Sequence, residues 1–342
     1  DTNNLTICRG GSKISGATLN PVLDTEGDSI KLIYVDATQG WLNVQTDDTV
    51  KGAPAFICAC GGTVTTSGDF KIHTFNSTST FKVNAAPTPA NNNVSYMVIG
   101  GGGGSGSSGG NSAGGGGAGG FRESAGCGYT SSPLGACVSA IPVSAQGYPV
   151  TIGAGGTNGG GHNSNPVKGT PGVPSTALGI TSAGGGTSGG GNPTAYNGDP
   201  GGSGGGVGSG VPGFTKVAGT GNQPPVSPPQ GNPAGIATSP QFVRSGGGGA
   251  TGVGGSGYCG SPTTADGGTG AGTGINPAPG VGTPGPCGSL RYFAGGGAGA
   301  SGSGGIGGGG GSGNGTTNTG GGGGDDNANG GSGVVMIRYK FQ

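Results

Sequence analysis

Glycine is the residue type that most limits what this chain can fold into. It occupies 95 of 342 positions, and its distribution is uneven, with 9 glycines in residues 1–94 and 86 in residues 95–342. Average usage is about 7%. A chain so poor in side chains cannot bury a conventional apolar core over its whole length, which excludes an ordinary close-packed enzyme. Two architectures are therefore expected to join near residue 94.

Charge excludes further classes of partner. The 13 basic and 13 acidic residues cancel to a net charge of zero. Nothing offers the basic surface that nucleic acid or an anionic membrane would require. The chain also contains no apolar run near the roughly 18–20 residues of a membrane span. The sequence thus predicts no nucleic-acid partner and no membrane insertion.

The glycine-poor part has the pattern of β structure. Apolar and alternating runs at residues 29–35 and 41–44 predict a hairpin, and residues 5–7 and 17–23 predict further short strands. About fifty residues make a very small core, and such modules usually need oligomerisation or another staple. We expect this module to be trimeric or to be fused to more β structure upstream.

Apolar strands bracket the glycine-rich tract. Residues 69–75 and 79–83 give a second hairpin signal, and residues 94–99 run directly into polyglycine. Residues 333–341 form a last strand, which we expect to pair with residues 94–99. The tract would then be a closed domain with its ends held together.

The tract itself has the composition of a flexible linker. Against that interpretation, glycine blocks of about three to five residues recur, separated by apolar phrases such as residues 148–152 and 177–183 that require burial. No Gly-X-Y register is kept, so a collagen helix is excluded. The remaining structure is a bundle of polyglycine-II segments with three residues per turn, whose backbone groups bond to neighbouring segments. Only glycine lets backbones approach closely on several sides.

The predicted fold class is therefore mainly β plus a polyglycine-II bundle, with almost no α-helix. The domain boundaries expected from these patterns are an N-terminal β module at 1–50, a linker at 51–68, and a glycine-rich domain at 69–342 with a β cap (69–99 and 332–342) around a polyglycine-II core (100–331).

The inserts between glycine blocks are expected to form loops at the ends of the bundle. They are approximately residues 121–146, 157–176, 192–200, 211–244, 258–266 and 275–293. Aromatic rings and arginines displayed on a rigid scaffold are typical of recognition surfaces, although such rings can instead cover the bases of loops. The candidate recognition residues are Tyr129, Tyr196, Phe214, Phe242, Tyr258, Arg291, Tyr292 and Phe293.

Seven cysteines leave two interpretations open. Cys127 with Cys137 and Cys259 with Cys287 each bracket an insert, which predicts two loop disulfides in a protein exposed outside the cell. Unpaired thiols in a chain assembled in a reducing cytoplasm are the alternative.

No catalytic constellation can be recognised. With only His73 and His162 as histidines, a zinc site or a Ser/His/Asp arrangement is not expected. The Gly-x-Gly-x-x-Gly match after residues 96–99 lacks the helix and the acidic residue of a dinucleotide site. Asp325 and Asp326 are more typical of a solvated loop than of a calcium site. We expect no enzyme, no cofactor and no metal.

Both halves resemble bacteriophage tail-fibre proteins. The sequence motifs on which the resemblance depends are residues 5–17 with 23–35 and 40–41 in the first half, and residues 68–75, 96–99, 149–156 and 331–339 in the second. The resemblance implies a virion fibre tip whose glycine-rich part is similar to the polyglycine-II sandwich of long-tail-fibre adhesins. It also implies loops that contact a host cell-surface receptor (protein or glycan), other virion fibre or tail proteins as partners, and a homotrimer. A fibre attached to the capsid would contain the same sequence motifs, so the resemblance fits a tail fibre and a capsid appendage alike.

Three functions stay open at this point. A receptor-binding fibre tip requires loops that converge at one apex of a rigid bundle. A passive structural or decoration fibre requires no such convergence. Binding of ice or glycan by a flat face would need regular ranks of Thr or Ala, which the sequence does not show.

Overall fold

The structure is a computed structural model of the chain. It describes all residues except 1–4, 24–29, 45–55, 88–91, 108–112, 127, 136–137, 161–166, 192–195, 210–214, 238–242, 258–264 and 326. All regular elements in the described part are β-strands, and none of its residues is helical. The expected fold class is confirmed.

The N-terminal module consists of two small antiparallel pairs. Strand β1 (Leu5–Thr6) pairs with β2 (Val22–Leu23), and β3 (Leu32–Asp36) pairs with β4 (Gly40–Asn43), which confirms the hairpin expected between residues 29 and 44. Among its described residues the buried apolar side chains are those of Ile14, Pro21 and Leu23. The module therefore has little core of its own.

The glycine-rich domain begins with a six-stranded antiparallel sheet in the cap. Its order is β10-β9-β17-β7-β6, with β11 pairing to the start of β9. The strands are β6 (Thr63–Ser67), β7 (Phe70–Phe75), β9 (Asn93–Ile99), β10 (Phe121–Glu123), β11 (Ile141–Pro142) and β17 (Val334–Lys340). The pairing of β9 with β17 confirms that the two apolar strands at the ends of the tract close the domain.

A five-stranded antiparallel sheet packs against the first one. Its order is β14-β13-β12-β8-β5, formed by β5 (Cys58–Cys60), β8 (Ser79–Ala85), β12 (Gly147–Thr151), β13 (Ser175–Ala177) and β14 (Ile180–Ser182). The core between the two sheets contains Phe75, Phe81, Tyr96, Ile337 and Tyr339. The cap is thus a small β-sandwich.

The six-stranded sheet is buried on its second face as well. Because side chains alternate along a strand, Met97 and Met336 point away from the sandwich core and form a second cluster. That cluster is completed by Phe121, Ile275 and Phe293 from two inserts. The short pair β15 (Ala271–Thr273) and β16 (Arg291–Phe293) carries part of this cover. Burial on both faces explains why β9 and β17 are almost continuously apolar.

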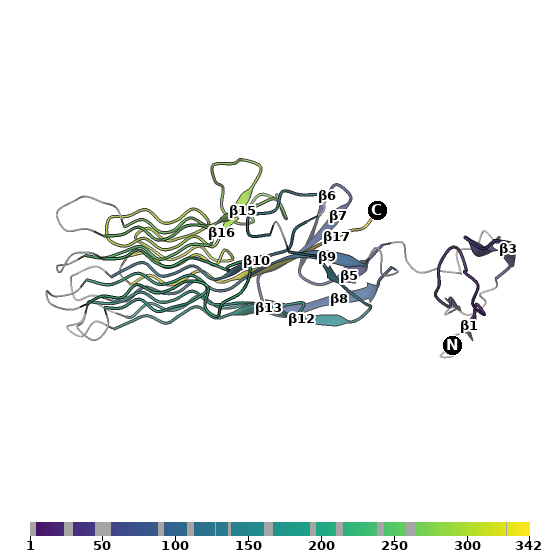
Figure 1. Cartoon of the computed structure of the whole chain (residues 1–342), viewed down its shortest axis with the longest axis horizontal. Helices are drawn as coiled ribbons and strands as arrows, with labels where there is room; N and C mark the ends of the chain where they lie inside the picture. The colour runs from purple at the N-terminus through teal and green to yellow at the C-terminus, as the bar shows by residue number, and fades with distance from the viewer. Residues whose placement is uncertain are drawn as a thin grey trace.

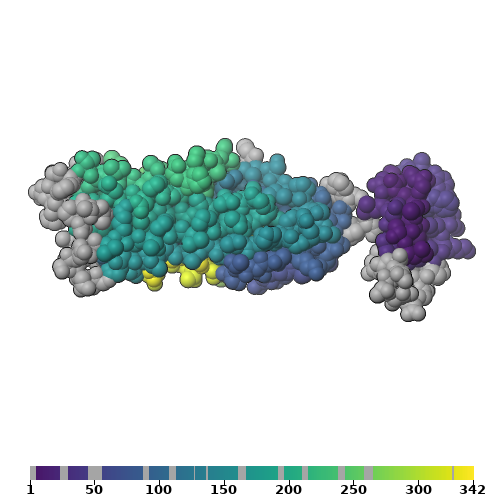
Figure 2. Space-filling view, turned by 90° about the horizontal axis from the view of Figure 1, so that it is seen from below, coloured from purple at the N-terminus to yellow at the C-terminus, as the bar shows by residue number. Residues whose placement is uncertain are grey.

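The rest of the domain is a lattice of extended segments that run side by side (Figure 1) and are bonded by their backbones. On one face, the teal and green part of this tract forms a continuous surface beside the blue part of the cap (Figure 2). Segment 100–107 donates in turn to segments 117–120, 167–173 and 328–331, and returns to the same neighbour every three residues. This period of three is the repeat of a polyglycine-II helix. The bonds, at N···O distances of 2.8–3.1 Å, are Gly100 and Gly103 to Gly120 and Gly117; Gly101, Gly104 and Ser107 to Val173, Thr170 and Val167; and Gly102 and Ser105 to Gly331 and Ala328.

The close spacing of these segments requires glycine. A Cβ at Gly102 would lie 2.0 Å from the carbonyl oxygen of Gly321, and one at Gly103 would lie 2.2 Å from that of Gly186. Backbone atoms inside a close-packed lattice cannot yield that much space. The expected polyglycine-II packing is therefore what the lattice shows.

Two details of the expected cap were wrong. Residues 69–75 and 79–83 do not form a hairpin, because β7 bonds to β6 and β17 in one sheet while β8 bonds to β5 and β12 in the other. The chain crosses from sheet to sheet between them. The expected linker at 51–68 also contains β5 and β6, so the cap begins by Cys58.

Candidate functional site at the distal rim

At the end of the lattice opposite the cap, described segments terminate beside the connections between them (Figure 1). We call the described residues that flank six of these connections the distal rim: Ser107, Ala113, Gly160, Val167, Gly191, Tyr196, Ser209, Thr215, Ala237, Val243, Gly257 and Ala265. Backbone bonds join its members, as from Ser107 N to Val167 O and from Gly191 N to Ser107 O. The rim is therefore a bonded platform.

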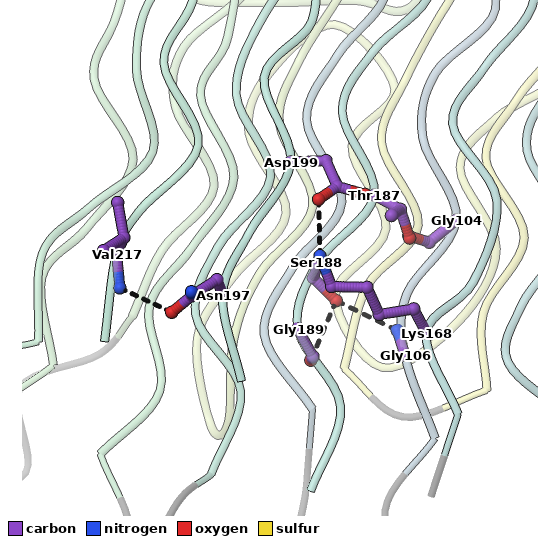
Figure 3. A network of polar contacts seen from close by, with 9 residues as sticks. All are labelled: Gly104, Gly106, Lys168, Thr187, Ser188, Gly189, Asn197, Asp199 and Val217. Atoms are coloured by element: carbon purple, nitrogen blue, oxygen red, sulfur yellow. Dashed lines mark hydrogen bonds and ion pairs between the residues drawn. The ribbon is translucent and has the colours of Figure 1, made fainter. Parts of the chain in front are cut away.

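An ion pair joins two outer segments next to the rim. The Nζ of Lys168 contacts the Oδ1 of Asp199, and both side chains are partly exposed (Figure 3). Lys168 follows one connection and Asp199 follows another. The pair therefore holds two insert-bearing segments together.

Hydroxyl and amide side chains add further bonds at the same level (Figure 3). Thr187 Oγ1 donates to the carbonyl of Gly104 at 2.8 Å, and Ser188 Oγ accepts from the N–H of Gly106 at 3.0 Å. Asn197 Oδ1 accepts from the N–H of Val217 at 2.8 Å. Side chains thus replace some of the backbone bonding where the segments approach the connections, and they fix the bases of the loops.

The aromatic residues expected at the apex divide into groups. Tyr196 belongs to the rim, but its ring is buried and forms part of the platform. Phe214, Phe242 and Tyr258 lie outside the described residues, so their role stays a prediction. Each belongs to a connection whose flanking residues are in the rim.

Four expected receptor-binding residues lie elsewhere, which corrects the expectation of one apex. Tyr129 is half-buried on the second face of the six-stranded sheet, and its hydroxyl donates to the carbonyl of Ser124 at 2.9 Å. Phe293 is fully buried in the second core cluster. Arg291 donates to the carbonyls of Val281 and Gly282, while Tyr292 lies against Gly272 and Gly285. The cause is the apolar second face of the sheet, which inserts 121–146 and 275–293 cover.

The same layer contains a buried carboxyl group. Glu123 accepts hydrogen bonds from the N–H of Ser132 at 2.8 Å and from the hydroxyl of Thr273. Burial raises the pKa of Glu123, and it also raises the pKa of the neighbouring Tyr129. Glu123 thus ties insert 121–146 to β15, next to insert 275–293.

The structure describes four of the seven cysteines. Cys287 is an exposed free thiol, as are Cys8, Cys58 and Cys60. Its expected partner Cys259 lies outside the described residues, as do Cys127 and Cys137. Disulfide pairing of the loops stays a prediction.

Sequence reasoning missed Lys168 and Asp199, although a signal was present. Lys168 is the only Lys, Arg, Asp or Glu residue of insert 157–176, and Asp199 is the only one of insert 192–200. In a chain with so few charges, one cation and one anion in two neighbouring inserts indicate a pair.

Two searches of the described residues were negative. No group of three or more His, Cys, Asp and Glu residues there could hold a metal ion. No described helix is long and apolar enough to cross a bilayer.

The fold defines a class: a protein whose described residues form no helix and in which a β-sandwich cap holds a polyglycine-II scaffold. A family model described as a glycine-rich domain matches residues 76–340, more than three quarters of the chain. The chain belongs to this glycine-rich domain family. Searches of curated proteins and of solved structures found no significant match.

Proposed function

We propose that this protein is the distal part of a bacteriophage tail fibre and binds a receptor on the host bacterial surface through the connections of the distal rim. The protein acts without catalysis and without a cofactor. Its location is the virion, and its partners are the receptor, a protein or a glycan, and the adjoining fibre or tail proteins.

One observation carries the proposal. Strand β5, the first described strand of the domain, and the last strand β17 both lie in the cap, while the described residues that flank six connections lie at the opposite end of the lattice. Attachment at the cap leaves the rim as the free end. Binding residues commonly lie on loops that a rigid scaffold positions.

The scaffold supports this function physically. Backbone bonds and the Lys168–Asp199 pair hold the bases of the connections, so that sequence changes in the loops leave the lattice intact. Preorganised loops lose less entropy on binding.

The test uses the purified full chain, labelled with a fluorophore and applied to a panel of bacteria. Substituting Phe214, Phe242 and Tyr258 by serine should reduce adsorption at least tenfold to the strain that binds. The variant Val64→Ser removes an exposed apolar side chain from the cap and should adsorb like the parent. Equal melting temperatures would show that all variants fold.

Two outcomes would contradict the proposal. If the parent chain adsorbs to no bacterium but assembles into fibres with other virion proteins, it is a passive structural or decoration fibre. If the triple substitution adsorbs unchanged, the rim connections do not bind the receptor.

A further inference from the structure

A pocket at the cap, distinct from the distal rim, has the composition of a binding site. Its volume is about 770 Å³, and it lies between the first residues of β7 and β9, the end of β17 and the insert that follows β10. Pockets of roughly 300–1,000 Å³ are typical for small ligands. The size is sufficient for a sugar of one or two rings.

The walls combine rings with neutral polar groups. Phe56 and Phe70 contribute aromatic surface, and Asn93 and Ser95 from β9 contribute an amide and a hydroxyl. Phe56 and Phe70 are both partly exposed, and Asn93 is exposed. Apolar faces beside amide and hydroxyl groups suit a ligand that is itself amphipathic, such as a pyranose ring.

The base of the pocket carries a buried cation. Arg338 is 2% exposed, and its guanidinium lies over Phe70 at 4.3 Å from the ring centroid and over Tyr129 at 5.3 Å. It donates to the carbonyls of Ile275 at 3.2 Å and Gly128 at 3.1 Å. Its Nε has no hydrogen-bond partner, and within the described part of the chain no carboxylate pairs with it.

An uncompensated buried charge gives the pocket a positive field. Because the surroundings of Arg338 are poor in water, its charge is weakly screened and acts across the pocket rather than by direct contact. At the entrance, Lys340 Nζ lies 4.0 Å from Asp69 Oδ2, and both side chains are more than half exposed. Lys340 is therefore available to an incoming anion. Asp69 competes with that anion for Lys340.

We propose that this pocket binds a sugar that carries a carboxylate, with the ring against Phe56 and Phe70 and the carboxylate near Lys340, in the field of Arg338. The site is separate from the rim, so the inference stands whether or not the rim binds a receptor. It assigns a ligand class, an acidic sugar, to a part of the cap whose role had appeared structural.

The test measures binding of glucuronate to the full chain by ligand-observed NMR, with methyl glucoside as the neutral counterpart and glutarate as the acid without a ring. We expect saturable binding of glucuronate, with methyl glucoside and glutarate both clearly weaker. Asp69→Asn should tighten glucuronate binding by about two- to fivefold, and Lys340→Gln should weaken it by a similar factor, the range expected for one partly exposed charge pair.

Controls separate this site from general charge effects. Lys168→Gln removes the same charge beside the rim and should leave glucuronate affinity unchanged. Both pocket variants change exposed side chains, so melting temperatures should stay near that of the parent. Three results would overturn the proposal: no saturable binding of glucuronate, equal binding of methyl glucoside, or an affinity unaffected by both Asp69→Asn and Lys340→Gln. Glutarate binding as tight as glucuronate would assign the site to acidic peptides instead.

Discussion

At the scale of single residues, what lies beside a glycine decides whether a Cβ can be accepted. Gly103 faces the carbonyl of Gly186 in a neighbouring segment. Ala118 is equally buried, yet its methyl group packs among apolar side chains of the second core cluster. Between the backbones of two lattice segments, no side chain can move aside to make room for a Cβ. Around Ala118, next to the cap, apolar side chains can.

Gly103→Ala should therefore destabilise the fold strongly. The added methyl would lie 2.2 Å from the carbonyl oxygen of Gly186, and we expect a loss of at least about 2–3 kcal/mol in the free energy of unfolding, as for overpacked cores. Chemical denaturation measures it. Gly313→Ala is the matched control, because nothing lies within 4 Å of a Cβ there and the position is exposed. A similar stability of the two variants would contradict the close-packed lattice.

His73 should make stability depend on pH. Its Nδ1 donates to the carbonyl of Gly61 at 2.6 Å, and its Nε2 lies 3.0 Å from the hydroxyl of Tyr339, from which the neutral ring can accept. Burial lowers the pKa of His73 below its ordinary value of 6.5. As pH falls below 6.5, the unfolded chain takes up a proton that the folded chain does not, and stability is lost by up to about 1.4 kcal/mol per pH unit.

The measurement is the difference between the unfolding free energies of the parent and His73→Phe from pH 7.5 to 5. The substitution costs about 1–3 kcal/mol at pH 7.5, because Gly61 and Tyr339 lose their partner. That cost should shrink as the pH falls. Taking the difference cancels the opposite trend expected from Glu123, whose pKa is raised. A constant difference would show that His73 does not titrate in this way.

At the scale of elements, each polyglycine-II segment is stable only through its neighbours. It has no internal hydrogen bonds, so an outer segment with fewer neighbours needs other contacts. Lys168 and Asp199 supply one such contact beside the rim, and the bond from Asn197 to Val217 supplies another.

A double-mutant cycle with Lys168→Met and Asp199→Asn tests this contact. We expect a coupling energy of about 0.5–1 kcal/mol, because the pair is partly exposed and screened by solvent. Hydrogen exchange should become faster in residues 167–170 and 197–199, while the cap stays protected. Lys31→Gln in the N-terminal module serves as the control for loss of one positive charge. Zero coupling with unchanged exchange would show that the pair does not hold the rim.

At the scale of the whole molecule, the N-terminal module exposes apolar side chains. Its hairpin exposes about half of Ile33, Tyr34 and Val35, with exposed fractions of 49%, 49% and 53%. A module whose described part buries so few apolar side chains gains too little from that core to stand alone. We propose that three copies associate through this hairpin.

The full chain should therefore sediment as a trimer of 31.5 kDa subunits. Ile33→Asp with Val35→Asp should shift the equilibrium towards the monomer, because charges would be buried at the contact. Val64→Asp, on an exposed cap position, should leave the trimer intact. Sedimentation velocity distinguishes the species. A monomeric parent chain at micromolar concentration would refute the proposal.

Part of this protein could be predicted from its sequence. The density and recurrence of glycine determine that segments pack backbone against backbone, since no other residue allows that spacing. The apolar runs of β9 and β17 determine that the tract closes on itself. These features are visible without coordinates because each depends on residue type and on short-range pattern.

The tertiary structure alone decided the rest. The alternation of apolar and polar residues in β7 and β8 shows which side chains are buried. It does not show which strands pair with them, so the placement of β7 and β8 in different sheets could not be predicted. Nor did the sequence show what would cover Met97 and Met336. Two inserts do so, and this removes Tyr129, Arg291, Tyr292 and Phe293 from the rim. Contacts between residues far apart in sequence depend on which apolar face remains uncovered, and that is settled only when the whole chain has packed.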